Sequence, residues 1–239
     1  MILEDPLQMA NPRKAFTENP WTDCRVEWTH SGVSPMYGGE PVNDDGSPLT
    51  EDISGGFAKG HYEQHMAVRG SISVGEEEWS VDGFGLRDHS WGPRFWQVPW
   101  WYRWLTGNCG ADSGFVVSIV ARKDGGRHMG GMILRDGEYE HIRKCAITTE
   151  WEGDDAYHHT IHATAETDVG SYEISGKVMN LIPLRNRRKT DDGEQLVTRI
   201  SEGMTEWTFE GRTGYGLSEY LDQIVDGKPV GAAEEQPLA

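Results

Sequence analysis

Apolar and polar residues alternate along most of the chain, with the two-residue period of extended strands that cover one face. No segment keeps the 3.6-residue apolar period of a helix over several turns. Asp-Gly and Gly-Gly pairs separate the alternating runs roughly every ten residues, which is typical of an antiparallel meander. The expected strands cover residues 24–29, 61–74, 78–84, 114–121, 128–134, 139–151, 157–167, 172–178, 197–209 and 214–224.

This order of strands and turns predicts an all-β fold whose antiparallel sheet closes into a barrel or forms a strongly curved sandwich. Closure leaves no sheet edge exposed, and a barrel of this kind can hold one small apolar ligand. We expect an N-terminal arm and long loop over residues 1–56, a β-barrel domain over 57–225 and a flexible acidic tail over 226–239.

The formal net charge of −17 argues against sequence-independent binding to nucleic acid or to an anionic membrane surface. No apolar run approaches the roughly 20 residues that a membrane helix needs. The acidic start of the chain lacks the basic and apolar regions of a signal peptide. Three cysteines, widely spaced, fit a reducing compartment better than a disulfide framework or a zinc site. We therefore expect a soluble, cytoplasmic protein.

One glycine-punctuated stretch, residues 83–94, gathers charged and aromatic side chains at the end of an expected strand. Gly92-Pro93 must end that strand, because proline has no amide proton and restricts the residue before it. Strand ends that carry charged groups are common places for functional sites on β scaffolds. The strand would thus deliver Arg87, Asp88 and His89 to its end.

Within this stretch Asp88 is the candidate general acid. In an extended chain it shares a face with Phe84 and Leu86, whereas its two sequence neighbours point the opposite way. If that face lines the barrel interior, loss of solvation favours the neutral carboxyl, which can donate a proton near neutral pH. The alternative is a strand-end salt bridge in which Arg87 or Arg94 holds an ionised Asp88.

A second polar cluster, His61-Tyr62-Glu63-Gln64, precedes this stretch by about one hairpin. If the hairpin forms, the cluster lies beside the stretch at 83–94; the alternative is an exposed polar strand end. The histidine pairs His61/His65 and His158/His162 have the spacing of metal ligands on a helix. On a strand four residues span about 13 Å, which is too far for one ion, so we predict no metal site and no cofactor.

Two further groups are candidates for binding a substrate. Aromatic residues crowd the segment after the stretch at 83–94, either as a core wedge or as an irregular lid that walls a substrate pocket. Near the C-terminus, Glu219-Tyr220 either adds polar contacts or simply closes the sheet. The predicted wall consists of Trp91, Trp96, Trp100 and Trp101.

The stretch at 83–94, with its Asp88-His89-x-x-Gly92 core, together with the cluster at 61–64 and Glu219-Tyr220, resembles a bacterial family related to carotenoid hydratases (hydroxyneurosporene synthases) and AttH-like proteins. The resemblance covers residues from about 20 to 225 and implies a lipocalin-like, calycin-type fold in tandem barrels. It also implies that Asp88 protonates a carbon–carbon double bond. The tyrosine that hydratases carry two residues earlier falls on Leu86 here, and Tyr62 would have to replace it. The N-terminal arm would be the remainder of a second barrel, or a second copy in a homodimer would cover the open side.

Two functions follow as hypotheses. The first is a cofactor-independent lyase, hydratase, isomerase or cyclase acting on an unsaturated apolar molecule such as a terpenoid, steroid or aromatic. Asp88 would be the acid, His89 or Tyr62 would orient it, and Arg87 and Arg94 would hold the segment. The rings, with His61, Glu63, Trp91, Trp96, Trp101, Glu219 and Tyr220, would bind substrate and stabilise a carbocation. The second is a non-catalytic lipocalin-like carrier in which Asp88 is ionised and structural.

Overall fold

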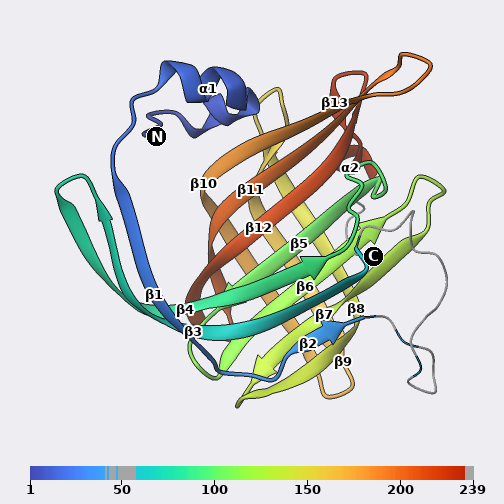
Figure 1. The fold of residues 1–239 in the computed structure, drawn as a ribbon. Helices are drawn as coiled ribbons and strands as arrows, with labels where there is room; N and C mark the ends of the chain where they lie inside the picture. The colour runs from blue at the N-terminus through green and yellow to red at the C-terminus, as the bar shows by residue number, and fades with distance from the viewer. Residues whose placement is uncertain (41, 43–46, 48–57, 235–239) are drawn as a thin grey trace.

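The computed structural model describes residues 1–40, 42, 47 and 58–234, and its main body is a closed antiparallel barrel (Figure 1). Each strand pairs with the next along the chain, and the last strand pairs with the first, so the ring has no free edge between them. The predicted all-β, lipocalin-like barrel is therefore confirmed. Its strands are β5 (Trp101–Asn108), β6 (Ser113–Ala121), β7 (Arg127–Arg135), β8 (Glu138–Glu152), β9 (Tyr157–Thr167), β10 (Ser171–Lys189), β11 (Gln195–Phe209) and β12 (Arg212–Val225).

Tight turns join several of these strands. Between β7 and β8, Asp136 and Gly137 have φ values of 51° and 83°, and between β11 and β12, Glu210 and Gly211 have φ values of 49° and 75°. Two central residues with positive φ make the hairpin turn whose twist matches that of the flanking strands. The Asp-Gly signal in the sequence thus predicts the first of these turns correctly. After β12 come the short β13 (Lys228–Pro229) and α2 (Val230–Glu234).

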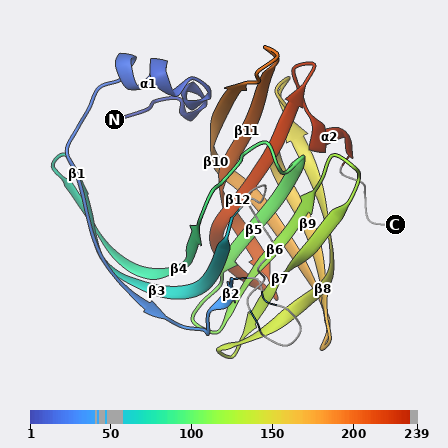
Figure 2. The same cartoon turned by 45° about the vertical axis from the view of Figure 1, so that its right-hand side comes forward.

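A second, smaller sheet carries the polar stretch at 83–94. Its central strand β3 (Gly60–Val74) pairs on one side with β4 (Glu77–Trp91) and on the other with β1 (Cys24–Gly32) and β2 (Tyr37–Gly39). Figures 1 and 2 show this sheet curving away from the barrel, with the β3–β4 turn clear of the ring and the other end against it. The hairpin expected from the sequence forms, but it lies outside the ring, which begins at Trp101.

The N-terminal segment folds as η1 (Pro6–Ala10) and α1 (Pro12–Glu18), and η1 packs against β10. Asp5 begins η1 and accepts a hydrogen bond from the Leu7 amide, and Asn11 caps α1 in the same way. Among the described residues, no helix has the length and apolarity needed to cross a membrane. The predicted N-terminal loop is partly wrong, because β1 extends to Gly32 and residues 37–39 form β2, whereas residues 41, 43–46 and 48–57 lie outside the described residues.

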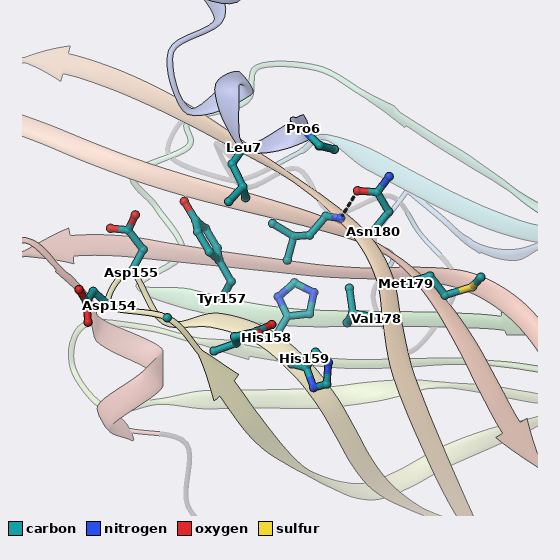
Figure 3. A pocket seen from close by; sticks show the side chains of 13 residues that line it. Pro6, Leu7, Asp154, Asp155, Tyr157, His158, His159, Val178, Met179 and Asn180 are labelled. Carbon is teal, nitrogen blue, oxygen red and sulfur yellow. Dashed lines mark hydrogen bonds between the residues drawn. The ribbon is translucent and has the colours of Figure 1, made fainter. Parts of the chain in front are cut away.

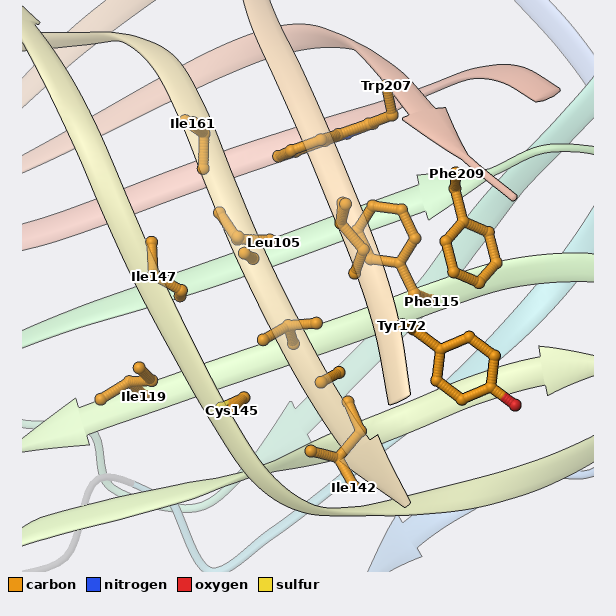
Figure 4. Packing of buried hydrophobic residues seen from close by; sticks show 14 of the residues in the cluster. Leu105, Phe115, Ile119, Ile142, Cys145, Ile147, Ile161, Tyr172, Trp207 and Phe209 are labelled. Atoms are coloured by element: carbon orange, nitrogen blue, oxygen red, sulfur yellow. The ribbon is translucent and has the colours of Figure 1, made fainter. Parts of the chain in front are cut away.

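The barrel interior is packed with side chains rather than hollow (Figure 4). Large rings such as Phe115, Trp207 and Phe209 meet edge to face, with centroids 5.3 to 5.4 Å apart, which is the favoured geometry for aromatic pairs. Towards one end of the interior, Arg103 and Asp222 form an ion pair with no solvent exposure, 3.2 Å from Nη1 to Oδ2. The side chains of the protein therefore occupy the centre of the ring, where a lipocalin-like barrel could hold a substrate.

Candidate active site

Strand register brings the two polar clusters of the sequence together. Glu63 on β3 lies opposite Asp88 on β4, and Tyr62 lies opposite His89. Because side chains alternate between the faces of a strand, Glu63 and Asp88 share one face of the ribbon with His61. That face meets the outside of the barrel, since Glu63 contacts Trp104 of β5. The predicted alternation along β4 is thus confirmed, but the surface it faces is the outer wall of the ring.

Asp88 occupies a different environment from the apolar cavity that its pattern suggested. Its side chain is 41% exposed, and its Oδ2 lies 2.6 Å from Nε2 of His61. The physical reason is that β4 lies outside the ring, where Leu86 and Asp88 cannot reach the interior. Of the two arginines that could clamp Asp88, Arg87 lies over the Tyr62 ring instead, and His61 is a direct partner of Asp88. This hydrogen bond to Asp88 is the main reason why the pKa of His61 is raised.

Glu63 is the carboxyl that the fold buries. It is 4% exposed, and its Oε1 accepts a 2.6 Å hydrogen bond from Nε1 of Trp104. Burial raises the pKa of Glu63, and the nearby His61, 3.9 Å away, partly offsets the effect. A buried carboxyl with a raised pKa thus stands next to the His61–Asp88 pair.

A second buried carboxyl comes from the barrel wall. Glu219 on β12 lies opposite Trp104 on β5, and the hydroxyl of Tyr102 donates a hydrogen bond to it. Burial raises the pKa of Glu219, and the charges of Glu202 and Asp88 raise it further. The hydrogen bond between Glu63 and Trp104, the strand partner of Glu219, places the ribbon and the wall at one junction. We call the group His61, Glu63, Asp88, Tyr102, Trp104 and Glu219 the junction cluster.

An apolar patch continues the barrel wall beside this cluster. Tyr102, Ile200 and Leu221 are buried there, in contact with partly buried side chains that include Trp96. Arg94 lies 5.2 Å above the ring of Trp96, in cation–π geometry. The acid–base groups therefore border an apolar cluster whose partly exposed members include Trp96 and Trp104.

Other predicted site residues lie elsewhere. Arg87, Tyr62 and His89 stack on the opposite face of the ribbon, with the Arg87 guanidinium 5.1 Å from the Tyr62 centroid and Tyr62 5.4 Å from His89. Trp91 lies on that face too, 5.7 Å from His89. Trp101 and Tyr220 are in the barrel core, and Trp100 donates a hydrogen bond to Glu234.

The sequence reading missed Tyr102 and Trp104. Residues 95–104 were expected to form an irregular lid, but from Trp101 onward they form β5. Alternate residues of that strand face inwards, as Trp101 and Arg103 do, or outwards to the junction. The sequence signal for this strand is the alternation of inward and outward positions from Trp101 to Leu105. The run of aromatic residues hides it, because aromatic side chains occupy both kinds of position.

The junction cluster also contains a set of atoms that could bind a cation. One ligand atom each from His61, Glu63 and Asp88 lie within 4.8 Å of one another. One imidazole and two carboxylates are a donor set that suits zinc, manganese or iron. The cluster differs from the histidine pairs weighed from the sequence, because carboxylates on neighbouring strands take the place of a second histidine.

Comparison with known proteins identifies the family. The model described as "Domain of unknown function (DUF7064)" matches residues 7–224, and the chain belongs to this family. An AttH-like protein of Nitrosomonas europaea has a similar structure, with a TM-score of 0.54, 15% identity, and coverage of 84% of this chain and 63% of that one. Kievitone hydratase of Nectria haematococca aligns over 69% of this chain and 53% of its own, at 11% identity and a TM-score of 0.40. No curated protein matches the chain.

The predicted AttH-like fold is thus confirmed at the level of architecture. This chain spans about 63% of the length of the Nitrosomonas structure. At such low identity the likeness concerns the fold, and the function has to be argued from the junction cluster.

Proposed function

We propose that this member of the DUF7064 family is an enzyme that transfers protons at an unsaturated carbon of an apolar small molecule. Adding or removing water, moving a double bond and closing a ring are the reactions of this class. One observation carries the proposal: the His61–Asp88 pair and two buried glutamates converge beside an apolar patch. Neighbouring titratable groups in unlike environments are typical of acid–base sites.

In this proposal Asp88 and His61 act as one proton-transfer unit, with Asp88 facing the substrate. The 2.6 Å contact lets a proton move between carboxylate and imidazole, and the 41% exposure of Asp88 leaves one edge open. For hydration, the unit gives a proton to one carbon of the double bond and water bonds to the other carbon. The surplus proton of that water then returns to the unit, so the sum is the addition of one water molecule.

Glu63 and Glu219 would bind the polar reactant or the polar group of the product. Because burial raises the pKa of each, their neutral forms can donate a hydrogen bond as well as accept one. Such groups can orient a water molecule or the hydroxyl group of a product. Trp96 and Ile200 of the apolar patch would hold the hydrocarbon part.

A carrier without chemistry is the second candidate, because the same apolar patch would bind a hydrocarbon whether or not a reaction follows. The two candidates differ in what Asp88 does. In the carrier, Asp88 only holds His61 in place. Replacing Asp88 would then change no reaction, because none is catalysed.

Incubation with a panel of unsaturated terpenoids, steroids and phenols, with products analysed by mass spectrometry, tests the proposal. We expect at least one compound to gain or lose a water molecule, or to isomerise, and Asp88→Asn to slow this about a hundredfold or more. Asp82→Asn is the matched control, since Asp82 lies on the same strand in an exposed pair with Arg69. Turnover by Asp88→Asn at the rate of the control would exclude the assigned role.

A further inference from the structure

A pocket lined by residues of η1, β9 and β10 reaches an interior histidine that the junction cluster does not use. Strand β9 pairs with β10 only as far as Thr160 and Lys177. Beyond that point a bulge between Val178 and Asn180 interrupts the pairing of β10 with β11. The pocket lies there, with a volume of about 470 Å³, and Pro6 and Leu7 of η1 form part of its wall.

His158 forms the inner end of this pocket. It is 2% exposed and stacks on Tyr220 with centroids 4.0 Å apart. In Figure 3 its imidazole stands between Tyr157 and Val178, on the side toward Leu7. The side chain therefore belongs to the barrel interior and to the pocket at once.

The hydrogen bonds of His158 decide which of its nitrogen atoms carries the proton. Nε2 lies 3.1 Å from the carbonyl oxygen of Ser218, which can only accept, and 3.0 Å from the Ser218 hydroxyl oxygen, which can accept or donate. We assign the proton to Nε2, because a hydrogen there can be donated to either oxygen. Burial, together with the charges of Arg103 and Arg199, lowers the pKa of His158 to about 3, and the ring is neutral at physiological pH. Nδ1 is thus a bare acceptor, and it has no partner among the residues that the structure describes. A buried acceptor without a partner is uncommon in folded proteins.

The charges around the pocket restrict what could satisfy this acceptor. Arg103 and Arg199 disfavour a cation beside His158. At the rim, Glu152, Asp154 and Asp155 disfavour an anion, although Arg185 lies 3.9 Å from Asp155. A neutral donor remains, and the side chains between rim and histidine are largely apolar: Leu7, Tyr157, Val178 and Leu181.

We propose that this pocket binds a neutral apolar molecule through a hydroxyl group that donates its hydrogen to Nδ1 of His158. Its volume lies within the range of about 300 to 1,000 Å³ that is usual for small-molecule sites. The ligand class is an apolar alcohol or phenol, and the site is separate from the junction cluster. This proposal does not depend on the reaction proposed for the junction cluster.

Calorimetric titration with 4-octylphenol and with its methyl ether, 4-octylanisole, tests the hydroxyl requirement. The two compounds share the hydrocarbon body and differ in the hydrogen that can be donated. We expect the ether to bind about tenfold more weakly, which corresponds to one hydrogen bond. On wild-type protein, ¹⁵N NMR should show the Nδ1 signal of His158 shifting with the phenol and not with the ether. Equal affinities, or no binding of either compound, would overturn the proposal.

Three variants locate the binding site. His158→Phe keeps a ring over Tyr220 and removes the acceptor, so it should bind phenol and ether equally. Leu181 is partly exposed in the pocket wall, so Leu181→Trp should fill the pocket without disturbing the fold. This variant should bind both compounds more weakly. Asp88→Asn should bind as the wild type does. A preference for phenol that survives in His158→Phe, or that disappears in Asp88→Asn, would place the compound elsewhere and contradict the proposal.

Discussion

At the scale of single residues, the pairing of Asp88 with His61 replaces the neutral acid that the apolar neighbours of Asp88 suggested. The hydrogen bond to Asp88 raises the pKa of His61, which favours the protonated imidazole of this pair. Glu63 and Glu219, which are more deeply buried, take the role of carboxyls with raised pKa. The chemistry predicted for one residue is therefore distributed over several.

Removing the partner of His61 gives the first prediction at this scale. Since the hydrogen bond to Asp88 raises the pKa of His61, Asp88→Asn should lower that pKa. An NMR titration of the histidine ring signals measures it. Because the folded pKa exceeds the unfolded value of about 6.5, the stabilisation by the pair is complete below pH 6.5 and is lost as pH rises through the folded pKa.

The same linkage gives the control. Between about pH 6 and 9, the difference in free energy of unfolding between wild type and Asp88→Asn should shrink as pH rises, by about 1 kcal/mol or less because water screens the pair. Asp82→Asn, which breaks an exposed arginine pair, should show no such trend over this range. A difference that grew with pH would contradict a protonated His61.

At the scale of elements, the barrel strands and turns were open to prediction from the sequence. Alternation and Asp-Gly pairs such as Asp136-Gly137 act locally, and local signals determine strand existence and hairpin turns. The β3–β4 hairpin follows for the same reason, and with it the proximity of His61 and Asp88. The position of this hairpin outside the ring could not be predicted, because it depends on contacts such as Glu63–Trp104, far apart in sequence.

Close approach of two barrel strands gives a prediction at the element scale. A Cβ atom at Gly216 of β12 would lie 1.9 Å from the carbonyl oxygen of Thr106 on β5. Gly216→Ala must therefore push apart the strands that close the ring and carry Tyr102 and Glu219. We expect a loss of about 2 kcal/mol or more in the free energy of unfolding, measured in urea.

Gly83 provides the matched control for this substitution. A Cβ atom there would meet nothing within 4 Å, so Gly83→Ala should change the stability by less than about 0.5 kcal/mol. If Gly216→Ala were equally harmless, the seam between β5 and β12 would have to be looser than the structure indicates.

At the scale of the whole molecule, the candidate site lies on the outer wall of the barrel because side chains fill the interior. The interior is occupied by rings such as Trp101 and Trp207 and by the Arg103–Asp222 pair. Asp222 also accepts a hydrogen bond from the Gly231 amide of α2, so the C-terminal segment fixes this pair from one end. The outer wall and the smaller sheet together supply what neither has alone, a set of buried carboxyls with a half-exposed acid.

The dependence of the site on two sheets leads to a final prediction. Trp104→Phe keeps the ring and removes the donor that holds buried Glu63 to the barrel. Leaving a buried carboxyl with one partner fewer costs about 1 to 3 kcal/mol. Hydrogen exchange followed by mass spectrometry should therefore become about tenfold faster at the junction end of β3 and β4, while strands β6 to β9 keep their protection.

Trp79→Phe serves as the comparison, because Trp79 is 47% exposed on β4, near the end of the ribbon remote from the barrel. It should leave the exchange at the junction end unchanged. If the proposed function is correct, Trp104→Phe should also lose activity in proportion to the faster opening, since Asp88 reaches substrate only while the ribbon lies on the wall. Faster exchange throughout the ring would instead mean that Trp104 stabilises the barrel itself, and unchanged exchange everywhere would mean that its bond to Glu63 does not hold the two sheets together.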